Sequence, residues 1–107
     1  MQEEPVVSVK DRVEEKPKRQ PLYHVILIND DQHTVEYVIN MCQRVFGHTL
    51  EKGLEIAREV HLSDKAILWT GVKEIAELRQ EQVHAFGKDH FVATCEGSMT
   101  AIIEPSI

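Results

Sequence analysis

The sequence predicts a small α+β domain, in which three helices cover one face of a three-stranded, mainly antiparallel sheet. The chain has 107 residues, of which 42% are hydrophobic, and this suits a single domain with a modest core. Short β-branched and aromatic runs alternate with segments whose apolar residues recur at helical spacing. These segments follow one another in the order β-α-α-β-α-β, with no internal repeat.

The first strand and the first helix are separated by a polar triplet. Residues 23–28 read Tyr-His-Val-Ile-Leu-Ile, which is typical of a strand. Asn29-Asp30-Asp31 ends this run, because short polar side chains favour turns and helix caps. Over residues 35–46 the apolar side chains fall at i, i+3, i+4, i+7, i+10 and i+11, which is one stripe of a helix. Gly47 is well suited to end that helix.

The second helix is predicted to begin after Thr49, a good N-cap, and to continue to the break at Ser63-Asp64. A second strand is expected over residues 65–69, Lys-Ala-Ile-Leu-Trp. Thr70 or Gly71 then caps a third helix, which Gly87 ends.

The C-terminal part contains two apolar segments. Residues 91–95, Phe-Val-Ala-Thr-Cys, are predicted to form the third strand of the sheet. Residues 99–103, Met-Thr-Ala-Ile-Ile, suit either a short fourth strand or a packed tail, and the sequence leaves the two alternatives open.

Charge and composition exclude several classes of protein. The 12 Lys and Arg against 18 Asp and Glu leave a formal charge of −6, which argues against nucleic-acid binding through bulk electrostatics. No apolar run approaches the roughly 20 residues that span a bilayer, and the N-terminus does not resemble a secretory signal. The sequence therefore predicts a cytoplasmic protein that binds neither nucleic acid nor a membrane.

The first part of the chain differs from the rest in composition. Residues 1–20 hold five acidic and five basic residues, no aromatic residue, and only four valines that suit a core. Such a segment buries too little apolar surface to offset the entropy of ordering it. We therefore expect a disordered N-terminal arm over residues 1–21 and one folded domain over residues 22–107. The arm is either a solvated tail or a segment that a partner captures.

No motif for catalysis, cofactor binding or metal binding stands out. The five glycines never cluster into a phosphate-binding loop, and no serine lies in a nucleophile elbow. The six histidines include no i, i+4 pair, and Cys42 falls on the apolar stripe of the first helix. Cys95, in the predicted third strand, is likewise expected in the core. We expect a protein that is not an enzyme and that uses neither a cofactor nor a metal.

The polar triplet is the chief candidate for chemistry. One reading is ordinary capping of the following helix, which needs only one of Asn29, Asp30 and Asp31. The other is a site where carboxylates and an amide carbonyl hold an ammonium group through charge-assisted hydrogen bonds. His61, at the end of the second helix, joins such a site if the two helices pack side by side, or it simply complements the helix dipole. Composition and spacing do not choose between these readings.

The sequence resembles the ClpS family, the adaptors of bacterial Clp proteases. The resemblance covers residues 22–96 and keeps the family's spacing without a gap through the third helix. The matching residues are Tyr23-His24-Val25-Ile26-Leu27-Ile28-Asn29-Asp30-Asp31, Glu36-Tyr37-Val38-Ile39, Val60-His61, Lys65-Ala66-Ile67 and Glu74-Ile75-Ala76-Glu77.

The resemblance implies an adaptor that binds proteins beginning with a bulky hydrophobic residue (N-degrons) and delivers them to a Clp AAA+ ATPase–protease. It implies that Asn29, Asp30 and His61 bind the free α-amino group, with Asp31 supporting them. It further implies a pocket for the first side chain, formed by Val35, Val38, Ala57, Val60 and Val92. Glu74 and Arg79 match positions that touch the N-terminal domain of the ATPase, and the arm matches a segment that engages the ATPase during delivery.

Two pocket positions depart from the family's pattern. Val35 and Ala57 stand where the family usually has methionine, so the preferred first residue differs from the common one or is broader. Residues 32–34, Gln-His-Thr, replace a Tyr-Thr-Pro-like segment, and either His33 or Thr34 is expected to start the helix. The same departures leave a second hypothesis: an interaction module of this fold that docks on a Clp ATPase or another partner with altered or lost N-degron binding.

Overall fold

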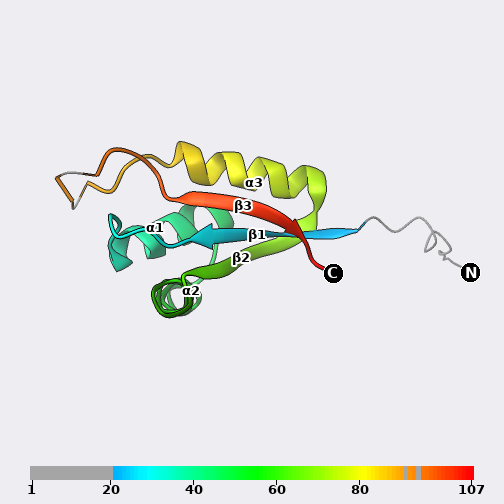
Figure 1. Cartoon of the computed structure of the whole chain (residues 1–107), viewed down its shortest axis with the longest axis horizontal. Helices are drawn as coiled ribbons and strands as arrows, with labels where there is room; N and C mark the ends of the chain where they lie inside the picture. Colours follow the sequence, from blue (N-terminus) through cyan, green and yellow to red (C-terminus); the bar gives the residue numbers. More distant parts are fainter. Residues whose placement is uncertain (1–20, 91, 94) are drawn as a thin grey trace, which may run out of the picture.

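The computed structural model describes residues 21–90, 92–93 and 95–107 (Figure 1). The arm expected over residues 1–21 lies, apart from Pro21, outside the described residues. The elements follow the predicted order β-α-α-β-α-β. They are β1 (Leu22–Ile28), α1 (Val35–Phe46), α2 (Leu50–Ser63), β2 (Lys65–Val72), α3 (Lys73–Ala85) and β3 (Thr100–Pro105).

The sheet has the strand order β2-β1-β3, and both pairs are antiparallel. β1 is therefore the central strand, with β2 and β3 on either side of it (Figure 1). Leu27 pairs with Ala66 of β2 and with Ala101 of β3, and all three side chains are buried. The apolar sides of α1, α2 and α3 complete this core, which confirms the predicted α+β arrangement.

Caps fix the ends of the first two helices. Thr34 is the N-cap of α1, and its hydroxyl accepts a hydrogen bond from the Tyr37 amide at 3.1 Å. Gly47 ends α1 at φ 70°, a left-handed conformation that glycine adopts without a steric penalty. Thr49 caps α2 by accepting from the Lys52 amide at 3.0 Å. The predictions for Gly47 and Thr49, and the expected start of the first helix, are confirmed.

The predicted caps of the third helix are wrong. β2 continues to Val72, so Thr70 and Gly71 lie within the strand, and Val72 precedes α3 without a side-chain cap. A side chain at Gly71 would collide with the Trp69 ring, to which an ideal Cβ atom would come within 2.0 Å. Gly71 therefore makes room for an aromatic ring. At the other end, α3 finishes at Ala85, two residues before Gly87.

The third strand is formed by a different segment from the predicted one. Of residues 91–95, those that the structure describes belong to no strand. The Val92 amide donates to the Asp89 backbone carbonyl, and the Cys95 amide donates to the Val92 backbone carbonyl. Residues 100–105 form β3 instead, and they pair with β1 from Ile28↔Thr100 to Tyr23↔Pro105. Both segments are rich in strand-forming residues, and pairing with β1 decides between them. The open alternative at residues 99–103 is thereby settled as a strand.

Candidate functional site

A small hollow of about 40 Å³ lies between α1 and α2, beside the end of β1. Its lining combines polar groups with an apolar wall. The lining residues are Asn29, His33, Thr34, Val35, Val38, Ala57, Val60, His61 and Met99.

The apolar wall follows from the spacing on the two helices. Val38 on α1 and Ala57 and Val60 on α2 are each about 3% exposed, and they face one another because α1 and α2 pack side by side. Gly53 permits a close approach, since a Cβ atom there would lie 3.3 Å from the Ile39 backbone. Val35 is 48% exposed and forms the rim of the hollow.

The polar triplet does not cap α1, because Thr34 does so. Asp30 instead folds back on its own turn, where its Oδ1 atom accepts from the Gln32 amide at 2.9 Å. The backbone amide of Asn29 donates to the backbone carbonyl of Asp64 at 2.9 Å, which ties the turn to the residue that follows α2. This tie brings Asn29 and His61 to the same hollow, so the two predicted polar partners meet although they lie 32 positions apart.

Not every predicted site residue lines the hollow. Asp30 and Asp31 follow Asn29 in the adjacent turn, with Asp31 exposed. Val92 is half-buried in the loop between α3 and β3. The C-terminal part of the chain contributes Met99 to the lining of the hollow. Met99 is 2% exposed and directly precedes β3.

Three residues that line the hollow were not predicted to act there: His33, Thr34 and Met99. Asp89, which binds Thr34, was not predicted either. The buried Asp89 carboxylate accepts from the backbone amide and the hydroxyl of Thr34 at 2.6 and 2.9 Å, and it thereby ties the α3–β3 loop to the start of α1. No sequence signal identifies Asp89, because it stands in an irregular segment. Met99 carries a weak signal, because it is the first residue of the apolar segment 99–103, for which the sequence allowed either a strand or a packed tail.

The two predicted partner-contact residues lie on α3, away from the hollow. Glu74 is exposed in the first turn of the helix. Arg79 is half-buried and donates from Nη1 to the Val45 carbonyl at 3.0 Å. Its guanidinium also lies 6.0 Å from the ring centres of Phe46 and Trp69. Arg79 therefore joins α3 to the end of α1, whatever else it contacts.

Burial raises the pKa of two core groups near the hollow. The Cys42 thiol has its pKa raised to about 12, because burial disfavours the charged thiolate. Burial likewise raises the pKa of Tyr37 to about 12, and its hydroxyl donates to the Gly87 carbonyl. Cys42 is thus a core residue, as predicted, and its thiol is poorly suited to act as a nucleophile.

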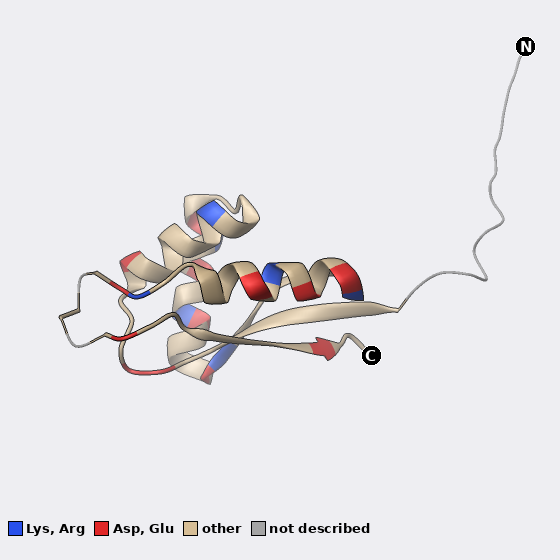
Figure 2. Ribbon diagram, turned by 90° about the horizontal axis from the view of Figure 1, so that it is seen from above, with Lys and Arg blue, Asp and Glu red and all other residues tan. Residues whose placement is uncertain are grey.

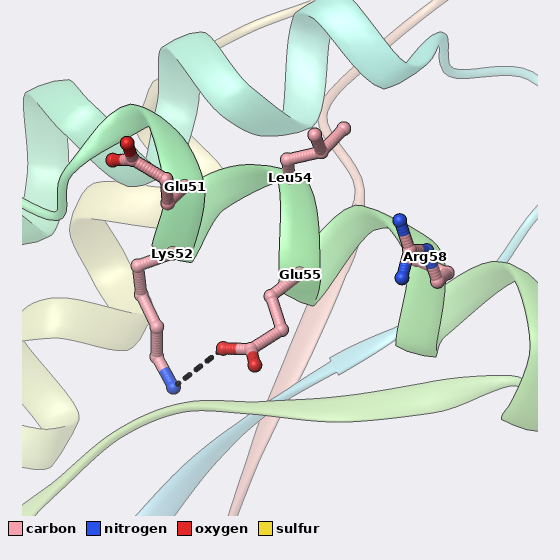
Figure 3. Close-up of a pocket in the computed structure, with 5 residues that line it drawn as sticks. All are labelled: Glu51, Lys52, Leu54, Glu55 and Arg58. Carbon is pink, nitrogen blue, oxygen red and sulfur yellow. Dashed lines mark ion pairs between the residues drawn. The ribbon is translucent and has the colours of Figure 1, made fainter.

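A second hollow, of about 380 Å³, has a different character (Figure 3). All five lining residues come from the outer surface of α2: Glu51, Lys52, Leu54, Glu55 and Arg58. Lys52 and Glu55 form an exposed ion pair at 3.6 Å. All five residues are exposed on the surface of α2, so their charges are those of a solvated helix.

Within the described part of the chain, no three His, Cys, Asp or Glu residues are grouped so as to hold a metal ion. None of the described helices is long and apolar enough to cross a membrane.

Comparison with known proteins identifies the family. Residues 18–92 match the family model of the ATP-dependent Clp protease adaptor protein ClpS. The chain belongs to the ClpS family. A ClpS adapter protein from Desulforapulum autotrophicum is 36% identical over 86 residues, covering 77% of this chain and 83% of that protein. One from Vibrio atlanticus is 37% identical over 81 residues, covering 76% and 74% of the respective chains.

A solved ClpS structure confirms the fold. Agrobacterium tumefaciens ClpS2, bound to L-phenylalaninamide, superimposes with a TM-score of 0.71 at 25% identity. The match covers 82% of this chain and all of that one. As a member of the ClpS family, the chain is an adaptor of a Clp protease and not an enzyme.

Proposed function

We propose that this adaptor binds proteins whose first residue is bulky and hydrophobic and carries a free α-amino group. It delivers them in the cytoplasm to a Clp AAA+ ATPase–protease. The observation that carries the proposal is the hollow between α1 and α2, where Asn29 and His61 share a lining with Val38, Ala57 and Val60.

The polar side of the hollow suits an ammonium group. An α-ammonium has three donors and a full charge, so it needs several acceptors that converge on it. The Asn29 carbonyl oxygen, the Asp30 carboxylate and a neutral His61 ring nitrogen supply them, with Asp31 adding negative charge nearby. An acetylated or internal amide has one donor at most and no charge, and it leaves acceptors unpaired at a cost of about 1–3 kcal/mol.

The apolar side suits the first side chain of the substrate. Burying a large apolar side chain contributes about 1.5–3 kcal/mol. L-Phenylalaninamide, which the similar Agrobacterium tumefaciens protein binds, combines an α-amine with an aromatic side chain. Val35 at the rim, Val38, Ala57, Val60 and the flexible Met99 form the corresponding wall here. Val92 does not line the hollow and is no part of this wall.

The partner surface is assigned to α3. Glu74, Glu77 and Glu81 recur at i, i+3 and i+7, and all three are exposed. Figure 2 shows acidic positions spaced along this helix. Such a stripe suits a basic surface on the N-terminal domain of a Clp ATPase. Arg79 lies on the same helix and is expected to help shape this contact through its hold on α1. The arm of residues 1–21 is proposed to engage the ATPase during delivery.

Peptide titration by fluorescence anisotropy tests the proposal. A peptide beginning with free Phe or Leu is expected to bind, and its N-acetylated form is expected to bind at least tenfold more weakly. Equal affinity for the two peptides would contradict amine recognition. A pull-down with the ATPase N-terminal domain separates the alternative: partner binding without any peptide binding indicates a docking module that has lost the N-degron site.

A further inference from the structure

The side chain of His33 is nearly inaccessible to solvent, although the residue stands in an irregular turn. Its side chain is 2% exposed, and it lies between the polar triplet and the loop that leads into β3. Its Nδ1 atom is 2.8 Å from Asp30 Oδ1, and its Nε2 atom is 2.8 Å from the Gly97 carbonyl oxygen. The ring therefore bridges two segments 67 positions apart, one carrying the candidate amine-binding carboxylate.

The two bridged atoms fix the protonation of the ring. The Gly97 carbonyl accepts and does not donate, so Nε2 must carry a proton. Asp30 Oδ1 already accepts from the Gln32 amide, and as a carboxylate it also requires a proton on Nδ1. The doubly protonated imidazolium is the form that satisfies both contacts, and it forms an ion pair with Asp30.

The surroundings of the ring are compatible with this arrangement. Nε2 lies 3.4 Å from Cys95 Sγ, and that thiol lies within 3.3 Å of the same Gly97 carbonyl. The Tyr37 ring centre is 4.5 Å from the imidazole. Asp89 accepts two hydrogen bonds from the neighbouring Thr34, and its backbone amide donates to Cys95 Sγ at 3.3 Å. The titratable groups that face the ring are thus Asp30, Cys95 and Tyr37, with Asp89 one residue removed.

The bridge affects both sides of the hollow. In the turn beside the polar side, it holds Oδ1 of Asp30 and so fixes the orientation of the carboxylate. Oδ2 of Asp30 has no hydrogen-bond partner among the described residues. On the apolar side, it holds Gly97 two residues before Met99, which lines the hollow. We propose that His33 is a positioning residue, which orients the Asp30 carboxylate toward the substrate's amine and clamps the segment that carries Met99. This inference rests on the proposed function.

The bridge also predicts which peptide discrimination depends on His33. If the ring orients the Asp30 carboxylate toward the amine, its loss weakens the binding of a free α-amine more than the binding of an acetylated one. A residue that acted only by filling space would weaken both to the same extent.

The experiment compares the wild-type chain with His33→Gln, His33→Ala and the exposed-histidine control His90→Gln. Each protein is titrated at pH 7 with a free Phe-initiated peptide and with its N-acetylated form, and circular dichroism confirms folding. We expect the His33 variants to bind the free peptide about tenfold or more weakly, with a smaller difference between the free and acetylated peptides, and His90→Gln to match wild type. Binding to the ATPase N-terminal domain is expected to stay unchanged.

Two further measurements keep the outcomes distinct. Nitrogen NMR of the wild-type protein is expected to show both His33 ring nitrogens in hydrogen bonds, to Asp30 and to Gly97, and a ring that lacks either contact would overturn the inference even if the variants fail to fold. Wild-type affinity in His33→Gln, or an equal loss for free and acetylated peptides, would also overturn it while leaving the proposed function intact. Absence of peptide binding by wild type would instead contradict the proposed function and, with it, any role of His33 in recognition.

Discussion

The two sides of the hollow are held in different ways. Apart from Met99, the apolar wall belongs to α1 and α2, which follow each other directly in the chain and bury Val38, Ala57 and Val60 between them. The polar corner is an irregular turn, and its hydrogen bonds run to distant positions: Asn29 to Asp64 and His33 to Gly97. The wall thus depends on local helix packing, whereas the corner depends on a loop from the far end of the chain.

This difference separates two kinds of defect. A change in the corner should impair recognition of the amine and leave the preference for the first side chain in place. A change in the wall should alter that preference and leave the discrimination against acetylated peptides in place. The predictions below use this separation.

The largest effect is expected from Asp30→Ala. Removing this carboxylate leaves a bound cation short of a charged acceptor, and hydrogen bonds to charged groups contribute about 1.5–3 kcal/mol. Affinity for a free Phe-initiated peptide should fall about 10- to 100-fold in a titration at pH 7. Glu55→Ala, on the exposed side of α2, is the matched control and should bind like wild type. An unchanged affinity in Asp30→Ala would contradict its assigned role.

Ala57→Leu changes the wall. Ala57 is 3% exposed in the hollow, so three additional carbon atoms must occupy the space that a substrate side chain needs. Overpacking of this kind costs about 1–3 kcal/mol, and we expect about tenfold weaker binding of Phe-initiated peptides with a shift toward smaller first residues. A peptide array measures the shift, and Ala57→Val should give an intermediate result. The same ranking of first residues in wild type and Ala57→Leu would show that Ala57 does not contact the side chain.

The stability of the core should fall at alkaline pH. The Cys42 thiol has its pKa raised from 9.0 to about 12, so the folded protein keeps a proton that the unfolded chain releases. The resulting stabilisation is complete below pH 9 and is lost as the pH rises toward 12. At pH 10 we expect a loss on the order of 1 kcal/mol, measured by urea unfolding. Cys42→Ala should show a shallower decline, and identical slopes for both proteins would contradict this account.

The smallest effect is expected on the outer surface of α2. Lys52 and Glu55 pair at 3.6 Å with both side chains exposed, and such pairs contribute about 0–1 kcal/mol. Lys52→Ala should therefore change neither peptide affinity nor thermal stability measurably. A tenfold loss of peptide binding would show that this larger hollow, and not the one between α1 and α2, is the recognition site.

The contrast between wall and corner also explains what the sequence revealed. The stripe of residues 35–46, the caps Thr49 and Gly47, and the burial of Cys42 depend on local periodicity and side-chain chemistry, and the structure confirms them. Asn29 and His61 were predicted to meet only if two helices packed together. The structure brings them to one hollow.

Predictions failed where distant pairing decides the outcome. Residues 91–95 and 99–103 have similar strand-forming composition, and only pairing with β1 selects the second segment. Asp89 and His33 act through contacts 55 and 64 positions away along the chain, so no local pattern marks them. Gly71, which looked like a helix cap, instead accommodates the Trp69 ring inside β2.

The most direct test is a cycle that combines peptide acetylation with one change on each side of the hollow. The ratio of affinities for free and acetylated Phe-initiated peptides is measured by anisotropy in wild type, Asp30→Ala and Ala57→Leu. The account predicts a ratio of at least tenfold in wild type and in Ala57→Leu, and a ratio that collapses toward one in Asp30→Ala. A ratio that survives in Asp30→Ala but collapses in Ala57→Leu would contradict the division between an amine-binding corner and a side-chain wall.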